Sequence, residues 1–109
     1  MKAMTLTAAT ALLMSISANA GDWIVQGRVT RLEPTFADHL NLRIDVNAGT
    51  CAAGGWLFFY GAGSTAADKQ ASVKAVYAGL LASLYAGGTI EVSGLNQGCV
   101  VEQVHLLRD

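Results

Sequence analysis

The sequence is poor in charged residues, and its few basic residues are dispersed. Lys and Arg account for seven of 109 residues, against eight Asp and Glu, which gives a formal net charge of −1. Proteins that bind nucleic acid usually gather Lys and Arg into a patch or stripe that neutralises phosphates. Because no such gathering is visible along the chain, we expect no nucleic-acid partner.

Residues that commonly carry catalysis or bind metals are also scarce. The two histidines, His39 and His105, do not lie at ligand spacing within a cluster of Cys, Asp or Glu. His39 follows Asp38 in an expected turn, where a solvated residue is favoured over a metal ligand. A solvated sheet face is likewise favoured over paired catalytic carboxylates for Asp45, Glu91 and Glu102. No Gly-x-Ser-x-Gly motif occurs, and we predict no enzyme activity, metal or cofactor.

Long apolar runs are lacking except at the N-terminus. Lys2 precedes an uncharged run over residues 3–16, and Ala18 and Ala20 give the small-x-small pattern of a cleavage site before Gly21. A membrane anchor is the alternative, but the run falls short of the roughly 18 to 20 strongly apolar residues that a span requires. We predict a cleavable signal peptide over residues 1–20, no stable membrane anchor, and an exported protein that is periplasmic or secreted.

Only two cysteines are present, Cys51 and Cys99, and both follow the predicted cleavage site. Removal of residues 1–20 leaves 89 residues, a single domain near the small end of what one core stabilises. Export places the cysteines in an oxidising compartment, where a pair normally joins. Two free thiols or half of a metal site are the alternatives, but zinc ligands usually come in closely spaced pairs. We predict a Cys51–Cys99 disulfide that contributes roughly 4 kcal/mol.

Alternating apolar and polar residues predict two strands in the first half of the mature chain. In residues 23–32 the residues of the apolar face are Trp23, Val25 and Val29. Pro34 cannot donate to a sheet and ends this strand. Residues 40–46 give the clearest period of two, with an apolar face of Leu40, Leu42, Ile44 and Val46. Each strand should therefore have one side in a core.

The run from Gly55 to Gly61 predicts a third strand, which is aromatic and bounded by glycines. In a small barrel, one of two sets of side chains must point outward: Trp56, Phe58 and Tyr60, or Leu57 and Phe59. Exposed aromatic side chains usually mark an interface or a platform on which sugars stack. Coverage of the outer face by the helix is the favoured alternative. We take Trp56, Phe58 and Tyr60 as the candidate ligand-binding residues.

The period changes from 2 to 3.6 between Ser64 and Ala86, which predicts one helix. Its apolar stripe consists of Val73, Val76, Tyr77, Leu80, Leu81 and Leu84. Thr65 with Asp68 predicts the N-cap, and Gly87-Gly88 predicts the end. A small-residue surface lies beside the stripe, at Ala71, Ala75, Ala78, Gly79, Ala82 and Ala86. We favour its packing on the protein's own sheet over its packing on a helix of another copy.

Two further strands are predicted after the helix, at residues 89–93 and 99–107. A five-stranded barrel with its helix between the third and fourth strands is the OB arrangement, named for oligonucleotide and oligosaccharide binding. We predict a mainly β domain of this kind, a small OB-like barrel with one helix and one disulfide, over residues 21–109. An open antiparallel sheet with the helix on one face is the alternative.

Several segments also resemble a known family. They are residues 51–56, the helix core 76–81, Gly87-Gly88 followed by residues 90–92, and the late Cys99. In these segments and in element order, the chain is similar to the binding subunits of subtilase-cytotoxin-type AB5 toxins and to related small exported bacterial proteins of unknown function. The resemblance implies an OB-type barrel, an internal disulfide and a ring-shaped homo-oligomer that recognises glycans. The chain is shorter than the toxin subunits, and no sugar-contacting residue is carried over.

Taken together, these features lead us to expect an exported, non-enzymatic binding module. Its expected ligand is a glycan or a protein, and a homo-oligomer is one expected assembly. The alternative is a monomeric structural or inhibitor-like exported protein that acts by protein contact. An exposed aromatic patch is expected for the first class, and a flat apolar patch without a pocket for the second.

Overall fold

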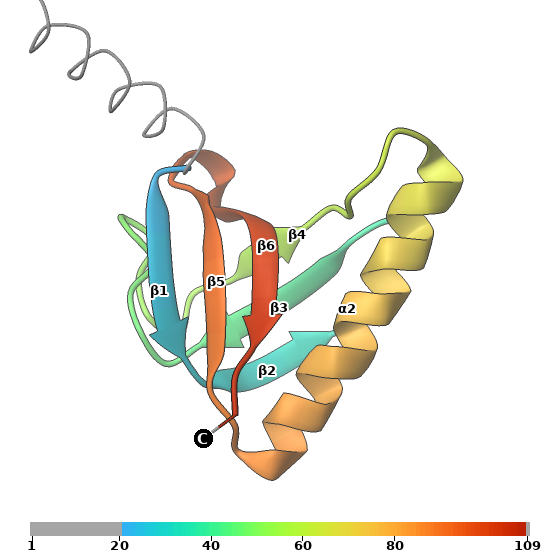
Figure 1. Ribbon diagram of the computed structural model, residues 1–109. Helices are drawn as coiled ribbons and strands as arrows, with labels where there is room; N and C mark the ends of the chain where they lie inside the picture. The colour runs from blue at the N-terminus through green and yellow to red at the C-terminus, as the bar shows by residue number, and fades with distance from the viewer. Residues whose placement is uncertain (1–20, 109) are drawn as a thin grey trace, which may run out of the picture.

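The computed structural model describes residues 21–108, so the predicted signal peptide lies outside the described residues. The described chain forms one sheet and one α-helix, with a short 3-10 helix before the last strand (Figure 1). In chain order the elements are β1 (Trp23–Gly27), β2 (Val29–Glu33), β3 (Leu40–Ile44), β4 (Leu57–Phe59), α2 (Ala66–Ala86), β5 (Ile90–Leu95), η1 (Gln97–Cys99) and β6 (Val100–Leu106).

The sheet has six strands in the order β1-β5-β6-β4-β3-β2. β4 and β6 are parallel, and the other four neighbouring pairs are antiparallel. Figure 1 shows β1, β5 and β6 side by side, with β3 and β4 crossing behind them. The fold is therefore a six-stranded open mixed sheet with one helix. In these terms the predicted combination of strands, a single helix and one disulfide is confirmed.

The predicted first strand, residues 23–32, is divided in the structure. β1 and β2 lie at opposite ends of the strand order, yet Arg28 alone separates them in the chain. The Arg28 amide donates to Asp45 Oδ1 (2.8 Å), and the Arg28 carbonyl accepts from the Asp45 amide (3.1 Å). A register shift follows between Val29 and Arg31, which is typical of a β-bulge. Before this bend the chain pairs with β5, and after it the chain pairs with β3. The single predicted strand is therefore two strands, and the sheet has six strands where five were predicted.

The sheet does not close into a barrel by hydrogen bonding. Within residues 21–108, no ladder of backbone hydrogen bonds joins its two edge strands, β1 and β2. The alternative prediction of an open antiparallel sheet is wrong at one pair, because β4 and β6 run parallel. Parallel neighbours require a long crossover that usually contains a helix. Here α2 and β5 lie between β4 and β6 in the chain and provide that crossover.

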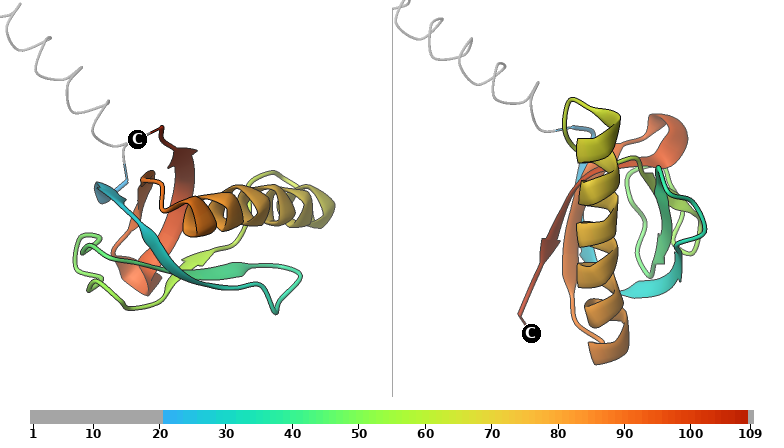
Figure 2. Two further views of the ribbon diagram at one scale, coloured as in Figure 1. Left: turned by 90° about the horizontal axis from the view of Figure 1, so that it is seen from below. Right: turned by 90° about the vertical axis from the view of Figure 1, so that its right-hand side faces the viewer.

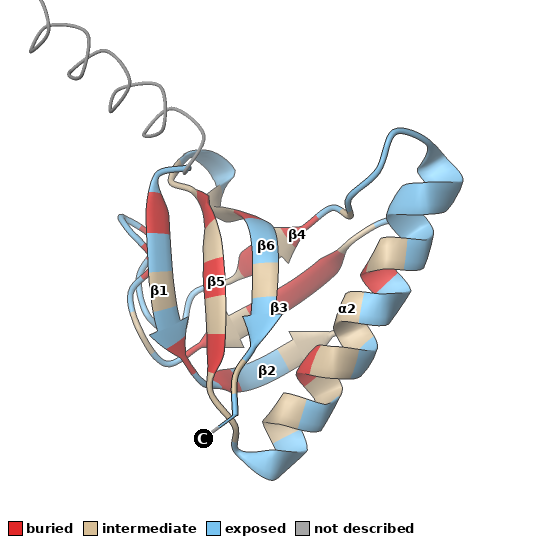
Figure 3. Ribbon diagram, in the orientation of Figure 1, coloured by how far each residue is buried: buried red, intermediate tan, exposed pale blue. Residues whose placement is uncertain are grey.

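The hydrophobic core lies between the inner faces of the strands and one side of α2. Figure 3 shows buried residues on these surfaces and exposed residues on the opposite side of the helix. The alternation predicted for residues 40–46 is confirmed over β3, where three residues of the apolar side are at most 2% exposed: Leu40, Leu42 and Ile44. The other strands and the helix contribute Trp23, Val29, Leu57, Phe59, Val73, Leu80, Ile90, Val92 and Val101.

The helix begins and ends where the sequence predicts. Thr65 Oγ1 accepts a hydrogen bond from the Asp68 amide (3.1 Å), which caps the N-terminus. Gly87 ends the helix in the left-handed conformation, with φ of 71°, and its amide donates to the Ser83 carbonyl. Figure 2 shows α2 across one side of the molecule, and it contacts β2 and β6.

The small-residue surface of α2 packs on the sheet at one point. Its alanines are exposed, whereas Gly79 is half-buried beside Leu106 of β6. A Cβ atom at Gly79 would lie 2.8 Å from Leu106 Cδ1. Packing of this surface on the protein's own sheet is the favoured prediction. That prediction is confirmed for Gly79, whereas the alanines do not pack on the sheet.

The predicted Cys51–Cys99 disulfide is present, with the two Cα atoms 5.9 Å apart. It ties the connection between β3 and β4 to η1. Asn96 strengthens the same link, because its Oδ1 accepts from the Thr50 amide (2.9 Å). A disulfide of this kind indicates folding in an oxidising compartment. Within residues 21–108, no helix has both the length and the apolar character needed to cross a membrane.

Candidate binding face on β3 and β4

The outward side chains next to and within β4 form a stripe of aromatic residues. Leu57 and Phe59 are buried, at 2% and 4% exposed, so the alternating residues point to the other face of the sheet. These are Trp56, Phe58 and Tyr60, the predicted candidates. Tyr60 is 48% exposed, and its ring stacks on that of Phe58 at 6.4 Å between centroids. Of the two orientations that the sequence left open, the structure has the one in which these three aromatics point away from the core; Tyr60 is exposed, and Trp56 and Phe58 are half-buried.

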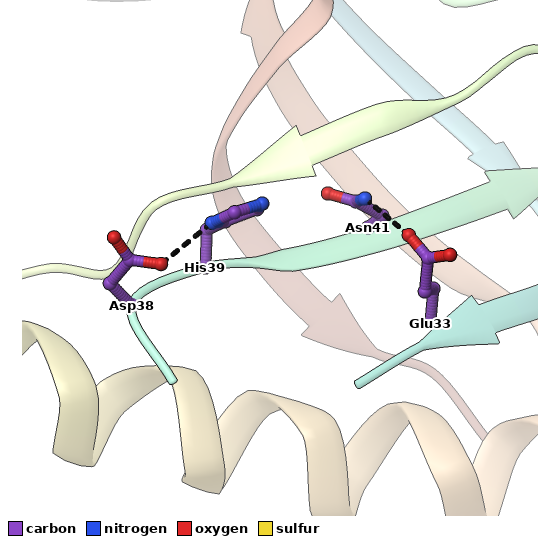
Figure 4. Close-up of polar contacts among 4 residues, drawn as sticks. All are labelled: Glu33, Asp38, His39 and Asn41. Atoms are coloured by element: carbon purple, nitrogen blue, oxygen red, sulfur yellow. Dashed lines mark hydrogen bonds and ion pairs between the residues drawn. The ribbon is translucent and has the colours of Figure 1, made fainter. Parts of the chain in front are cut away.

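His39 extends this stripe beyond Tyr60. Its ring stacks on Phe36, with centroids 4.5 Å apart, and lies 5.5 Å from the Tyr60 ring. Its Nδ1 is 2.8 Å from Asp38 Oδ1 (Figure 4). The expectation of a solvated turn residue is wrong, because two aromatic rings flank the His39 side chain and leave it 20% exposed.

Asn41 provides the polar centre of the same surface. It lies opposite Phe58 of β4 and opposite Glu33 of β2. Its Nδ2 donates to Glu33 Oε1 at 2.6 Å, and Figure 4 shows Asn41 beside His39 on one side of β3. Asn41 is 7% exposed, and its Oδ1 has no hydrogen-bond partner among the described residues. A ligand hydroxyl group that reached this oxygen would satisfy a buried acceptor.

Two arginines extend the surface at the Trp56 end. Arg31 of β2 and Arg43 of β3 are cross-strand partners. The Cζ atom of Arg43 lies 4.1 Å from the centroid of the Trp56 ring, within the range of a cation–π contact. The Nε atom of Arg43 is buried without a hydrogen-bond partner in the described protein. Basic residues that are dispersed in the sequence are therefore brought together here.

We call this surface the β3–β4 face, and it consists of Arg31, Glu33, Phe36, His39, Asn41, Arg43, Trp56, Phe58 and Tyr60. A cavity of about 250 Å³ opens at one end of it, between the β2–β3 connection and α2. Phe36 and His39 line one side of the cavity, and Lys74 and Tyr77 line the other. Sites that enclose a small-molecule ligand usually measure roughly 300–1,000 Å³. The β3–β4 face is therefore an open platform with a shallow pocket at one end.

The three strand carboxylates do not converge on a common site. Asp45 is bonded to the backbone at the β1–β2 bend, and Glu91 accepts from the Gln26 side chain (3.2 Å) and lies 3.4 Å from His105. Glu102 is exposed on β6. Across residues 21–108, no group of three or more His, Cys, Asp and Glu side chains is placed to hold a metal ion.

Sequence reasoning found the aromatic stripe and missed its neighbours. The period of two in residues 39–45 carries the signal for three of them, because His39, Asn41 and Arg43 alternate with buried leucines. Phe36 lies in the connection between β2 and β3, and Arg31 follows a β-bulge. Alternation along a regular strand therefore does not show that either residue lies on this face. Residues 56–60 are all aromatic or apolar, so that run itself gives no sign that polar groups of β3 lie beside the rings.

Comparison of the chain with protein-family models, with curated proteins and with solved structures found no match. The resemblance to the toxin binding subunits therefore stays a prediction.

Proposed function

We propose that this protein is an exported, non-enzymatic binding module that holds a glycan on the β3–β4 face. The observation that carries the proposal is the outward aromatic stripe of Trp56, Phe58 and Tyr60. Flat aromatic rings stack on the apolar faces of sugar rings, and amide and carboxylate groups bond sugar hydroxyls. Asn41 places an amide directly beside Phe58, and the carboxylate of Glu33 lies next to Asn41.

The strand connections support an OB-like barrel as the finer description of the fold. β1 and β2 are consecutive, so the chain itself joins the two ends of the strand order. Taken as one bent strand, they leave five strands, with the helix between the third and the fourth and with the third and fifth parallel. β3 and β4 then correspond to the second and third strands of an OB barrel. In OB folds these strands form the surface that binds oligosaccharides and oligonucleotides.

The disulfide and the sequence of residues 1–20 support a periplasmic or secreted location. Glycans of cell surfaces and extracellular polymers are accessible from both places. The location therefore agrees with a glycan ligand and leaves its source open.

A protein ligand, or a second copy of this chain, is the second candidate, and it would use a different surface. An apolar groove of about 200 Å³ lies between α2 and β6, lined by Ala75, Val76, Gly79, Val104 and Leu106. Leu106 is 53% exposed, and grouped exposed apolar side chains often mark protein contacts. Light scattering coupled to size exclusion separates a homo-oligomer from a monomer that acts through protein contact.

The proposed glycan binding is tested on protein purified from the periplasm after expression of the full chain. A glycan array identifies a ligand, and calorimetry measures its affinity for the parent protein and for Tyr60→Ala. Loss of one stacking ring is expected to weaken binding about tenfold. The matched control is Tyr85→Ala, since Tyr85 is 85% exposed and lies on α2.

Two results would contradict the proposal. The first is an array without any bound glycan. The second is a Tyr60→Ala variant that binds as tightly as the parent, or that loses no more affinity than Tyr85→Ala.

A further inference from the structure

We infer that the β3–β4 face selects a glycan that carries anionic groups, and that Arg31 and Arg43 bind one of these groups beside Trp56. A sulfate ester and a carboxylate share the relevant chemistry, because both present several oxygen atoms to the N–H groups of a guanidinium. The inference rests on the proposed function. It adds the charge of the ligand and the residues that recognise that charge.

Two positive charges lie opposite each other on neighbouring strands. Arg31 and Arg43 are register partners of β2 and β3. Partners of this kind in an antiparallel pair have Cβ atoms roughly 4.5–5.5 Å apart, and like charges there are destabilising. Neither arginine forms an ion pair with a carboxylate within residues 21–108. An anionic group bound by both side chains would remove their mutual repulsion.

Arg43 is held in place without a ligand. Its guanidinium lies over the Trp56 ring, and its Nε atom is buried. The carboxylate on the same surface, Glu33, already accepts a short hydrogen bond from Asn41. A side chain that is fixed in advance loses less conformational entropy when it binds. Arg43 therefore presents a charged group that the protein does not neutralise.

The distribution of charge on the β3–β4 face fits a glycan better than a nucleic acid. A nucleic acid carries a phosphate at every nucleotide and favours a continuous track of basic residues. Here Glu33 follows Arg31 on β2, and Asp38 lies next to the face, against His39. Both carboxylates would repel such a line of phosphates. A charged glycan carries neutral hydroxyls between its anionic groups. That pattern matches two arginines at one end and Asn41 with aromatic rings along the rest.

Trp56 allows binding at this position to be followed directly. The purified protein is titrated with dextran sulfate, with polygalacturonate and with neutral dextran, and tryptophan fluorescence is recorded. Trp56→Phe identifies the Trp56 signal, because the other tryptophan, Trp23, is 6% exposed and lies in the core. Dextran sulfate tests the sulfate ester, and polygalacturonate tests the carboxylate.

The same titrations are made with Arg31→Gln and Arg43→Gln. The matched control is Arg108→Gln, which removes the same charge from an exposed residue that follows β6. We expect at least one charged polymer to bind and neutral dextran to bind more weakly. The affinity should fall about tenfold in each of the two face variants and stay unchanged in Arg108→Gln.

The melting temperature of Arg31→Gln distinguishes ligand contact from a structural role. Since Arg31→Gln removes a like-charge repulsion, its melting temperature should be unchanged or raised while its affinity falls. A melting temperature that falls in step with the affinity would assign Arg31 a structural role and would contradict the inference.

The remaining outcomes are also decisive. Binding of neutral dextran alone, weakened in Tyr60→Ala but not in the arginine variants, would overturn this inference and leave the proposed function standing. Failure of both charged polymers to bind, or equal losses in all three arginine variants, would overturn it as well. A single-stranded oligonucleotide that bound as tightly as the polymers, with the same dependence on Arg31 and Arg43, would overturn the assignment to a glycan.

Discussion

The guanidinium of Arg43 lies over the indole ring of Trp56, with 4.1 Å between Cζ and the ring centroid. This contact joins β3 to the residue that precedes β4 and links the arginine pair to the aromatic stripe. The cation and the rings therefore form one continuous surface, and changes at this point should affect both stability and binding.

Arg31→Gln and Arg43→Gln should change stability in opposite directions. Loss of the Arg43 contact with Trp56 should lower the free energy of unfolding by about 0.5–1 kcal/mol. Arg31→Gln should raise it by a few tenths of a kcal/mol, on the order of the like-charge repulsion that it removes. Urea unfolding followed by fluorescence measures both. Equal destabilisation by the two substitutions would show that Arg31 makes a stabilising contact and would contradict this account.

Asn41 should tolerate an apolar residue better than a charged one. Asn41→Leu removes a buried acceptor that has no partner, but it also removes the hydrogen bond to the half-buried Glu33 carboxylate, which water can replace. The unfolding free energy should therefore fall by about 1 kcal/mol, while glycan affinity also falls. Asn41→Asp would place a second carboxylate beside Glu33 and should lower stability by about 2–3 kcal/mol at neutral pH. Unfolding curves at neutral and acidic pH test this difference. The loss in Asn41→Asp should shrink at acidic pH, where one of the two carboxyls is protonated; a loss that is independent of pH would exclude charge repulsion as its cause.

The disulfide should supply a large part of the stability of this small domain. The cysteines are 48 positions apart and enclose β4, α2 and β5. Replacement of Cys51 and Cys99 together by alanine should lower the unfolding free energy by roughly 4 kcal/mol. Urea unfolding with and without reductant provides the control, because reductant should destabilise the parent protein and leave the double variant unchanged. A parent protein that is indifferent to reductant would contradict this prediction.

Two glycines should respond oppositely to alanine. At Gly79 the new Cβ meets the end of the half-exposed Leu106 side chain, which can shift, so the gain in helix propensity should raise stability by about 0.5 kcal/mol. At Gly94 the Cβ would collide with the Val100 carbonyl and with the Trp23 ring. Gly94→Ala should therefore lower stability by about 3 kcal/mol or more. Thermal melts of both variants test the pair, and a destabilised Gly79→Ala would show that Leu106 is held firmly in the α2–β6 groove.

Local patterns in the sequence predict most of the fold. The period of two identified the buried leucines of β3, and the capping residues Thr65 and Gly87 fixed both ends of α2. The break at Arg28 could not be predicted in this way. It depends on hydrogen bonds to Asp45, a residue of a different segment, and on a register shift that side-chain alternation alone does not reveal.

The candidate site was only partly predictable for a similar reason. Trp56, Phe58 and Tyr60 are neighbours in the sequence, and their common face follows from alternation. The contacts of His39 with Phe36 and Tyr60, and the pairing of Arg31 with Arg43, depend on strand register and on the path of a connection. Their proximity arises only when the strands are assembled.

The most direct test of the account maps the ligand contact on the protein by NMR. Amide chemical shifts of the isotope-labelled, exported protein are recorded as the glycan identified on the array is added. We predict the largest changes at residues 31–43 and 56–60. Changes confined to the groove between α2 and β6, or to the opposite face of β5 and β6, would contradict the assignment of glycan binding to the β3–β4 face.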